Sequence, residues 1–143
     1  MNADLANKLT RVGRKQTLKL THYGRKSGKP YQVTTWFIVA GDKVFLSTAN
    51  IQRQWVRNVL KTPRVQLTIA GETYDGQARF LADPAEHERV MRMVLRKYWF
   101  VAPFMLLWRL AQRAGLLVDR TGSFEVTPAA ANRIASADSV DGA

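Results

Sequence analysis

The chain has 143 residues, and its 22 lysine and arginine residues outnumber its 11 aspartate and glutamate residues, giving a formal net charge of +11 at pH 7. This length fits one domain with a sizeable core. The lack of cysteine excludes disulfides, thiolate nucleophiles and cysteine-type zinc sites, and two histidines are too few for a histidine metal cage, so we expect no metal site. The charge indicates an anionic partner, which could be a nucleic acid, an anionic membrane or a polyanionic cofactor.

Short strands and interspersed helices are predicted along the chain from apolar periodicity, glycine turns and capping residues. Asp83, for example, is the expected N-cap of a helix whose first residue is Pro84. The expected elements are a helix at Ala3–Val12, strands at Thr17–Tyr23, Tyr31–Ala40 and Lys43–Ser47, a helix at about Ile51–Lys61, strands at Arg64–Ala70 and Glu72–Leu81, helices at about Pro84–Tyr98 and Pro103–Ala114, and a strand at Thr121–Thr127. Because strands and helices do not alternate regularly, we expect an α+β, mainly β fold: a mostly antiparallel barrel with peripheral helices. Residues 1–128 would form this single domain, and residues 129–143 a disordered tail.

The stretch Gly24–Pro30 is predicted to be a basic turn between the first two strands. Its two glycines permit positive φ and a close approach of the backbone to a ligand. Arginine, lysine and serine side chains within it are suited to binding phosphate or carboxylate. The turn leads into a strand, so it is not a Walker loop, which precedes a helix. A basic hairpin tip without a ligand is the alternative that composition leaves open.

The predicted helix Ile51–Lys61 places Trp55 and Asn58 on one face. A buried asparagine needs hydrogen-bond partners, so this pair is either a structural unit of the core or part of a site. Asn50 is the expected N-cap of this helix. The free N–H groups that follow Ser47–Asn50 would then form an anion site at the helix start.

The segments Thr21–Pro30 and Gln54–Val65 together resemble the deazaflavin-dependent nitroreductase family, over about residues 15–127. The resemblance implies a split β-barrel oxidoreductase that uses coenzyme F420, with FMN as the alternative cofactor. It also implies a set of cofactor-binding residues: Gly24, Arg25, Lys26, Ser27, Gly28, Lys29, Thr48, Ala49, Asn50, Trp55 and Asn58. Ser47 or Thr48 would supply the catalytic proton, with Tyr31 and solvent as other donors. His22 is expected to be a structural strand residue.

The stretch Tyr98–Val118 is the second distinctive feature. Its uncharged run is much shorter than the roughly 20 residues that span a bilayer. Trp99 and Trp108, flanked by cations such as Arg96 and Arg109, are typical of a helix that lies on a membrane surface. A lid on the barrel mouth, a dimer interface and a wall of an apolar substrate pocket are the alternatives. The stretch resembles the membrane- and lipid-associated branch of the family.

We therefore expect an F420H2-dependent reductase that transfers hydride to a hydrophobic acceptor, such as an unsaturated lipid, an enone or a quinone-like molecule. The alternative is a non-catalytic carrier of F420 or of a fatty acyl chain. No nucleic-acid-binding motif accompanies the charge, so no nucleic-acid partner is expected. A second copy of the chain is a candidate partner. The N-terminus lacks an apolar signal segment, which indicates the cytoplasm, with peripheral association at the inner membrane face.

Overall fold

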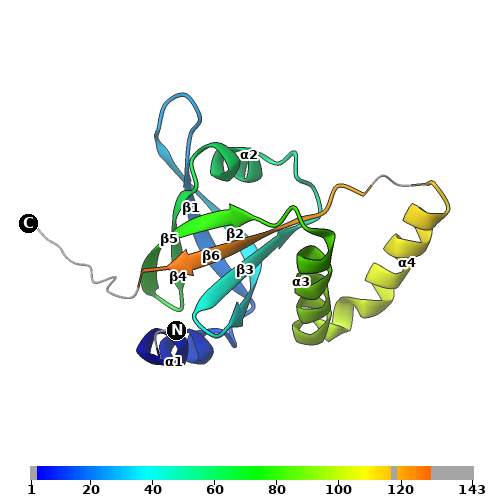
Figure 1. Ribbon diagram of the computed structural model, residues 1–143, viewed down its shortest axis with the longest axis horizontal. Coiled ribbons are helices and arrows are strands. Elements are labelled where there is room, and N and C mark those ends of the chain that lie inside the picture. The colour runs from blue at the N-terminus through cyan, green and yellow to red at the C-terminus, as the bar shows by residue number, and fades with distance from the viewer. Residues whose placement is uncertain (1–2, 117–118, 130–143) are drawn as a thin grey trace, which may run out of the picture.

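In the computed structural model six strands close into a barrel in the order β1-β2-β3-β6-β5-β4, and every neighbouring pair is antiparallel (Figure 1). The structure describes residues 3–116 and 119–129. The elements are α1 (Ala3–Val12), β1 (Thr17–Tyr23), β2 (Pro30–Ala40), β3 (Lys43–Thr48), α2 (Gln54–Lys61), β4 (Arg64–Ile69), β5 (Glu72–Phe80), α3 (Pro84–Lys97), the 3-10 turn η1 (Trp99–Val101), α4 (Ala102–Arg113) and β6 (Gly122–Pro128). The expected antiparallel barrel with peripheral helices is confirmed.

Period-two alternation of apolar side chains builds the barrel interior. In β4, Val65, Leu67 and Ile69 are all fully buried, because alternate side chains of a strand point to the same face. β1 and β3 contribute Leu18, Leu20, Val44 and Leu46 to the same core cluster. The hairpin turns at Gly41 and Gly71 have positive φ angles of 64° and 83°, which glycine adopts without steric penalty.

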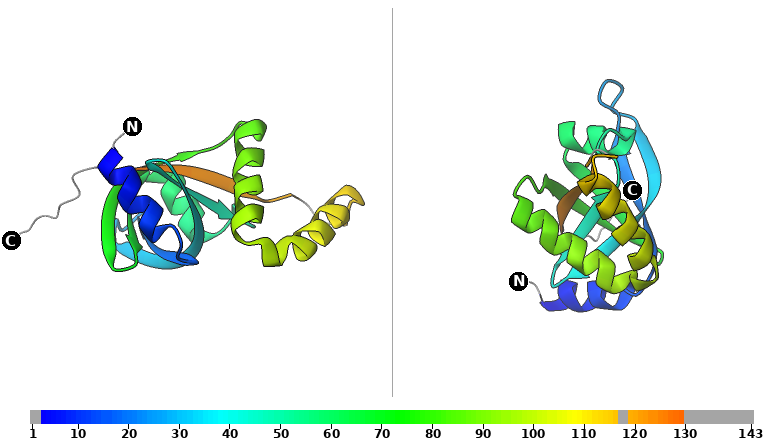
Figure 2. Two further views of the ribbon diagram at one scale, coloured as in Figure 1. Left: turned by 90° about the horizontal axis from the view of Figure 1, so that it is seen from below. Right: turned by 90° about the vertical axis from the view of Figure 1, so that its right-hand side faces the viewer.

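The helices cover different parts of the barrel. Helix α1 closes one end with Leu5, Leu9 and Val12, which belong to the barrel core (Figure 1). Helix α2 lies at the other end, beside the β1–β2 turn, and contacts β1. Helix α3 packs along β2, β3 and β6, whereas α4 packs on η1 and projects away from the barrel (Figure 2). Asp83 caps α3 by accepting a hydrogen bond from the Ala85 N–H at 2.9 Å, as the sequence predicts.

Tyr98 lies at the end of α3 and is fully buried. Its ring stacks on Trp36 with centroids 4.2 Å apart, and its hydroxyl donates to the Gln16 carbonyl at 2.5 Å. The preceding Lys97 donates to the Phe37 carbonyl at 2.8 Å. Tyr98 is therefore part of the core, and the prediction that the surface stretch begins at this residue is wrong.

The largest boundary difference lies between β3 and α2. Asn50 does not cap a helix beginning at Ile51, because its side-chain oxygen accepts the Gln52 N–H at 2.9 Å and so closes a turn. Helix α2 begins at Gln54, after Arg53, whose side chain makes no capping hydrogen bond. This correction removes the predicted anion site at the helix start next to Asn50. An asparagine side chain can stabilise a turn as readily as a helix start, which explains the misplacement.

The other boundaries agree with the predictions to within one or two residues. In the predicted tail, Ala129 donates its N–H to the Asp75 carbonyl at 2.7 Å and so extends the pairing of β6 with β5 by one residue. Residues 130–143 lie outside the described part of the chain, so their predicted disorder stays a prediction.

Candidate functional site

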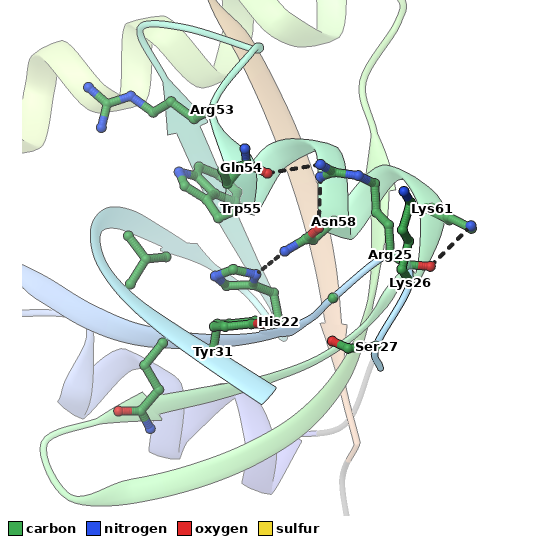
Figure 3. Close-up of a pocket in the computed structure, with 13 residues that line it drawn as sticks. His22, Arg25, Lys26, Ser27, Tyr31, Arg53, Gln54, Trp55, Asn58 and Lys61 are labelled. Atoms are coloured by element: carbon green, nitrogen blue, oxygen red, sulfur yellow. Dashed lines mark hydrogen bonds between the residues drawn. The ribbon is translucent and has the colours of Figure 1, made fainter. Parts of the chain in front are cut away.

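A cavity of about 1030 Å³ lies between the β1–β2 hairpin and α2 (Figure 3). The hairpin supplies eight of the thirteen lining residues, and α2 with the residue before it supplies five. The lining residues are His22, Gly24, Arg25, Lys26, Ser27, Tyr31, Gln32, Val33, Arg53, Gln54, Trp55, Asn58 and Lys61. The size is at the upper limit of the range, about 300–1,000 Å³, of cavities that hold cofactors and drug-sized ligands.

The basic turn is closed by its own backbone. The Gly24 N–H donates to the Lys29 carbonyl at 2.9 Å, and the Gly28 N–H donates to the Gly24 carbonyl at 3.0 Å. Gly28 has a φ of 70°, a value at which any side chain would be strained. The Ser27 hydroxyl oxygen accepts the Lys29 N–H at 3.1 Å, which leaves the hydroxyl proton available to a ligand.

Arg25 ties this turn to α2. Its guanidinium donates to the Asn58 side-chain oxygen at 2.8 Å and to the Gln54 side-chain oxygen at 2.9 Å (Figure 3). In return, the Lys61 ammonium donates to the Arg25 carbonyl at 3.1 Å. Gln54, Asn58 and Lys61 stand at positions i, i+4 and i+7 of the helix and so share one face. Two of the Arg25 donors are therefore engaged in holding the site together, and the remaining donors can contact a ligand.

Asn58 also connects Arg25 to His22. Its side-chain nitrogen lies 2.9 Å from the His22 Nδ1 atom, and both residues are buried. Burial lowers the pKa of His22 from its ordinary value of 6.5. The imidazole is therefore neutral at pH 7 and can act as both a donor and an acceptor.

The cavity has a cationic end and an aromatic end. Lys26 and Lys61 join Arg25 at the cationic end, whereas Arg53 lies beside Trp55 at the start of α2 (Figure 3). None of the lining residues that the structure describes is acidic. At the other end the ring of Tyr31 stacks near that of His22, with centroids 5.9 Å apart. Trp55 is also buried there, 5.8 Å from the Phe124 ring. Such a cavity suits an anionic ligand that carries a planar ring system.

The structure brings one group of the predicted cofactor residues together around this cavity. Gly24, Arg25, Lys26, Ser27, Trp55 and Asn58 all line it. Gly28 and Lys29 belong to the same turn, but they shape it through their backbones and do not line the cavity.

The residues predicted after the third strand are placed elsewhere. Ser47 lies in β3 opposite Ser123, and the Thr48 hydroxyl is engaged with the backbone of Asn50 at 3.1 Å. None of Ser47, Thr48, Ala49 and Asn50 lines the cavity. Their roles as proton donors or cofactor ligands stay predictions, and this cavity does not support them.

Sequence reasoning missed six of the lining residues: His22, Gln32, Val33, Arg53, Gln54 and Lys61. Gln54 and Lys61 could have been found from helical spacing, because they flank Asn58 on its own face. The partner of His22 is 36 positions away in the chain, so no local pattern identifies it.

The comparison with protein families finds one match. Residues 2–100 match the model of the F420H(2)-dependent quinone reductases. The chain belongs to this family. As a member of the F420H(2)-dependent quinone reductases, it is an F420-dependent oxidoreductase, and F420 is its cofactor. The match confirms the oxidoreductase and the cofactor expected from the sequence resemblance; it gives no support to a nitroreductase activity. A comparison with curated protein sequences finds no significant match.

Three solved structures with similar folds are distant from this chain in sequence. A conserved hypothetical protein from Mycobacterium tuberculosis has 20% identity and a TM-score of 0.65, over 86% of this chain and 79% of that one. A structure described as an F420 reductase has 18% identity and a TM-score of 0.54, over 85% and 93%. A structure described as a domain-swapped dimer has 20% identity and a TM-score of 0.60, over 78% and 80%. At these identities the similarity shows the shared fold alone.

Two other features of the quinone reductase chain bear on its possible ligands. Within residues 3–116 and 119–129, no helix is long and apolar enough to cross a bilayer. In the same part of the chain, no group of three or more His, Cys, Asp or Glu side chains could hold a metal ion.

Proposed function

We propose that the cavity between the β1–β2 hairpin and α2 binds F420, and that the enzyme reduces a hydrophobic, quinone-like acceptor. The phosphate and glutamate tail of the cofactor would lie at the cationic end, near Lys26 and Lys61. The deazaflavin ring would lie at the aromatic end, near Tyr31 and Trp55. Bound F420H2 would supply the hydride, and solvent or a side chain such as Tyr31 would supply the proton that completes the reduction. The main tasks of the protein would then be to bind and orient the reactants.

The observation that carries this proposal is the separation of charge along the cavity. Lysine and arginine side chains without a single carboxylate line one end, and these groups favour phosphate and carboxylate. The aromatic side chains of Tyr31 and Trp55 line the other end, with Arg53 beside Trp55 (Figure 3), and a flat ring can stack there. An uncharged ligand would gain nothing from the cationic end, whereas F420 matches both ends.

The test is a fluorescence titration of the purified protein with F420, and with FMN as the competing cofactor. We expect F420 to bind more tightly. Lys26→Ala should weaken F420 binding about tenfold, because one charge-assisted contact is lost. The loss should shrink as salt is added, since salt screens charge interactions. The control is Lys8→Ala, which removes an exposed lysine from α1, at the opposite end of the barrel. Equal affinities of Lys26→Ala and Lys8→Ala would refute the proposal.

A second surface supports a hydrophobic, lipid-borne acceptor. None of the residues of α4 is buried. The large apolar side chains of η1 and α4 that are at least half exposed are Trp99, Phe100, Phe104, Leu106, Leu107 and Leu110. We call these six residues the η1–α4 apolar face. Surfaces of this kind mark interaction sites in proteins.

We assign an anionic membrane surface as the occupant of the η1–α4 apolar face. Exposed arginines accompany it, namely Arg92 and Arg96 on α3 and Arg113 on α4. Apolar side chains flanked by cations are what an interfacial helix presents to anionic lipid. This docking would place the enzyme at the inner membrane face of the cytoplasm, close to quinones or other lipids. The domain-swapped dimer among the structural neighbours makes a second copy of the chain the competing occupant.

Co-sedimentation with vesicles tests this assignment. We expect binding to anionic vesicles that exceeds binding to neutral ones and that salt reverses only in part, because apolar insertion is insensitive to salt. The double variant Trp99→Ser, Phe104→Ser should lose the salt-resistant part and keep its F420 affinity. Trp108 is half-buried, so it is less suitable than Phe104 for this test. If the wild type forms a dimer but binds no vesicles, and the double variant is a monomer, the η1–α4 apolar face would be assigned to a second copy of the chain instead.

A further inference from the structure

The position of the His22 proton follows from the contacts of Asn58. The Arg25 guanidinium can only donate, so the Asn58 atom that it contacts at 2.8 Å must be the amide oxygen. The Asn58 amide nitrogen then faces His22, and its N–H donates to Nδ1 at 2.9 Å. An Nδ1 atom that accepts a hydrogen bond carries no proton. The proton of the neutral imidazole is therefore on Nε2.

The Nε2–H group is a donor without a protein acceptor. Among the described residues, the one hydrogen bond of the His22 ring is that of Nδ1 with Asn58. His22 lines the cavity, and Figure 3 shows its second ring nitrogen on the side of the ring away from Asn58, in the view between Trp55 and Tyr31. This is the aromatic end of the cavity. A polar N–H that opens into a binding site is available to a ligand acceptor. A ligand that displaces water from this N–H must accept a hydrogen bond from it, because leaving the donor unpaired would be unfavourable.

We propose that His22 is a cofactor-binding residue whose Nε2–H donates a hydrogen bond to an oxygen or nitrogen atom of the F420 ring system. This inference rests on the proposed function, because it requires the ring to lie at the aromatic end. Arg25 and Asn58 act on the ring through His22 as positioning residues, since together they hold the proton on Nε2. A hydrogen bond to a ring heteroatom both orients the cofactor and tunes its electronics.

The surroundings of His22 keep the imidazole in its neutral form. The charged groups that line the cavity are all cationic: Arg25 and Lys26 from the turn, and Arg53 and Lys61 from the start and end of α2. No carboxylate among the described lining residues could stabilise an imidazolium ion. The donor is consequently a neutral N–H, and its contribution to binding should not depend on salt.

Nuclear magnetic resonance of isotope-labelled histidine tests the tautomer. The chain has two histidines, and His87 lies outside the cavity lining. In the variant His87→Gln every histidine signal therefore comes from His22. In the ligand-free protein we expect the proton on Nε2 and the neutral form at pH 7. Asn58→Asp should move the proton to Nδ1, because a carboxylate can only accept a hydrogen bond. A proton on Nδ1 in the protein with native Asn58 would overturn the inference.

Addition of F420 to the same labelled protein tests the contact. We expect the Nε2–H signal to shift in proportion to the bound fraction measured by fluorescence. An Nε2–H signal that stays in place at saturation would overturn the role of His22. If Lys26→Ala still weakens binding in that case, the proposed function stands without this inference. If Lys26→Ala binds F420 as well as wild type does, the proposed function fails, and the inference fails with it.

The variant His22→Phe keeps a ring beside Tyr31 and removes the N–H. We expect its F420 affinity to fall about three- to tenfold, which corresponds to the loss of one neutral hydrogen bond. The same loss should appear at low and high salt, in contrast to Lys26→Ala. Wild-type affinity in a folded His22→Phe protein, or a loss that disappears at high salt, would contradict the proposal. If this variant does not fold, the signals of the labelled protein decide the question.

Discussion

Asn58→Leu is the most informative single substitution, because Asn58 is buried and joins the basic turn to His22. Leucine has nearly the same size but can neither accept from Arg25 nor donate to Nδ1. The His22 Nδ1 atom would remain buried without a partner, which should destabilise the fold by about 1–3 kcal/mol, partly offset by the added apolar contacts. A net loss of about 1–2 kcal/mol should lower the melting temperature by about 3–6 °C for a domain of this size.

Asn58→Leu should also weaken cofactor binding. Arg25 loses its anchor on α2, and the His22 proton loses its fixed position, so F420 affinity should fall at least about tenfold. Fluorescence titration and thermal unfolding measure the two effects on the same sample. Arg57→Leu, on an exposed residue of α2 outside the cavity lining, controls for a general disturbance of the helix. A lowered melting temperature with wild-type affinity would show that Asn58 has only a structural role.

Two further predictions concern the fold. Burial lowers the pKa of Lys97 from 10.5 to about 8, so between these values the unfolded state binds more protons and stability should rise with pH. Lys97→Met should therefore show a smaller rise in melting temperature than wild type between pH 8 and pH 10.5, and parallel curves would contradict the assigned pKa. Gly28→Ala should destabilise the protein by about 1 kcal/mol in denaturant unfolding, because residue 28 has a φ of 70° while its Cβ would meet no other atom. An unchanged unfolding midpoint would show that the turn can adopt another conformation.

Local sequence patterns were sufficient for most of the barrel. The strand predicted at Arg64–Ala70 is present as β4, and its alternating residues Val65, Leu67 and Ile69 are all buried. Asp83 followed by Pro84 predicted the start of α3, because these residues satisfy or remove the free N–H groups of a first helical turn. The basic turn was recognisable for the same reason: its glycines and cations act over a few neighbouring residues.

The contents of the site depended on contacts between distant segments. The sequence predicted Trp55 and Asn58 as a pair, but it could not show that Asn58 would contact Arg25 and His22 across the barrel end. Asn50 illustrates the opposite error, since its local pattern fitted both a helix cap and a turn. The pairing of β3 with β6 holds Ser47 and Thr48 in the barrel wall, and residues 47–50 do not line the cavity. This pairing is a tertiary contact that the local sequence does not show.

The stretch after α3 shows the limit most clearly. Composition alone determined that Tyr98–Val118 is apolar, aromatic and flanked by cations, because these are properties of the residues themselves. Which of these side chains face solvent was decided by tertiary structure. Tyr98 is drawn into the core by its stacking on Trp36, while Trp99, the next residue, is 72% exposed. Two neighbouring aromatic residues with nearly the same intrinsic preference for burial thus take opposite positions, because only one of them meets a partner on the barrel.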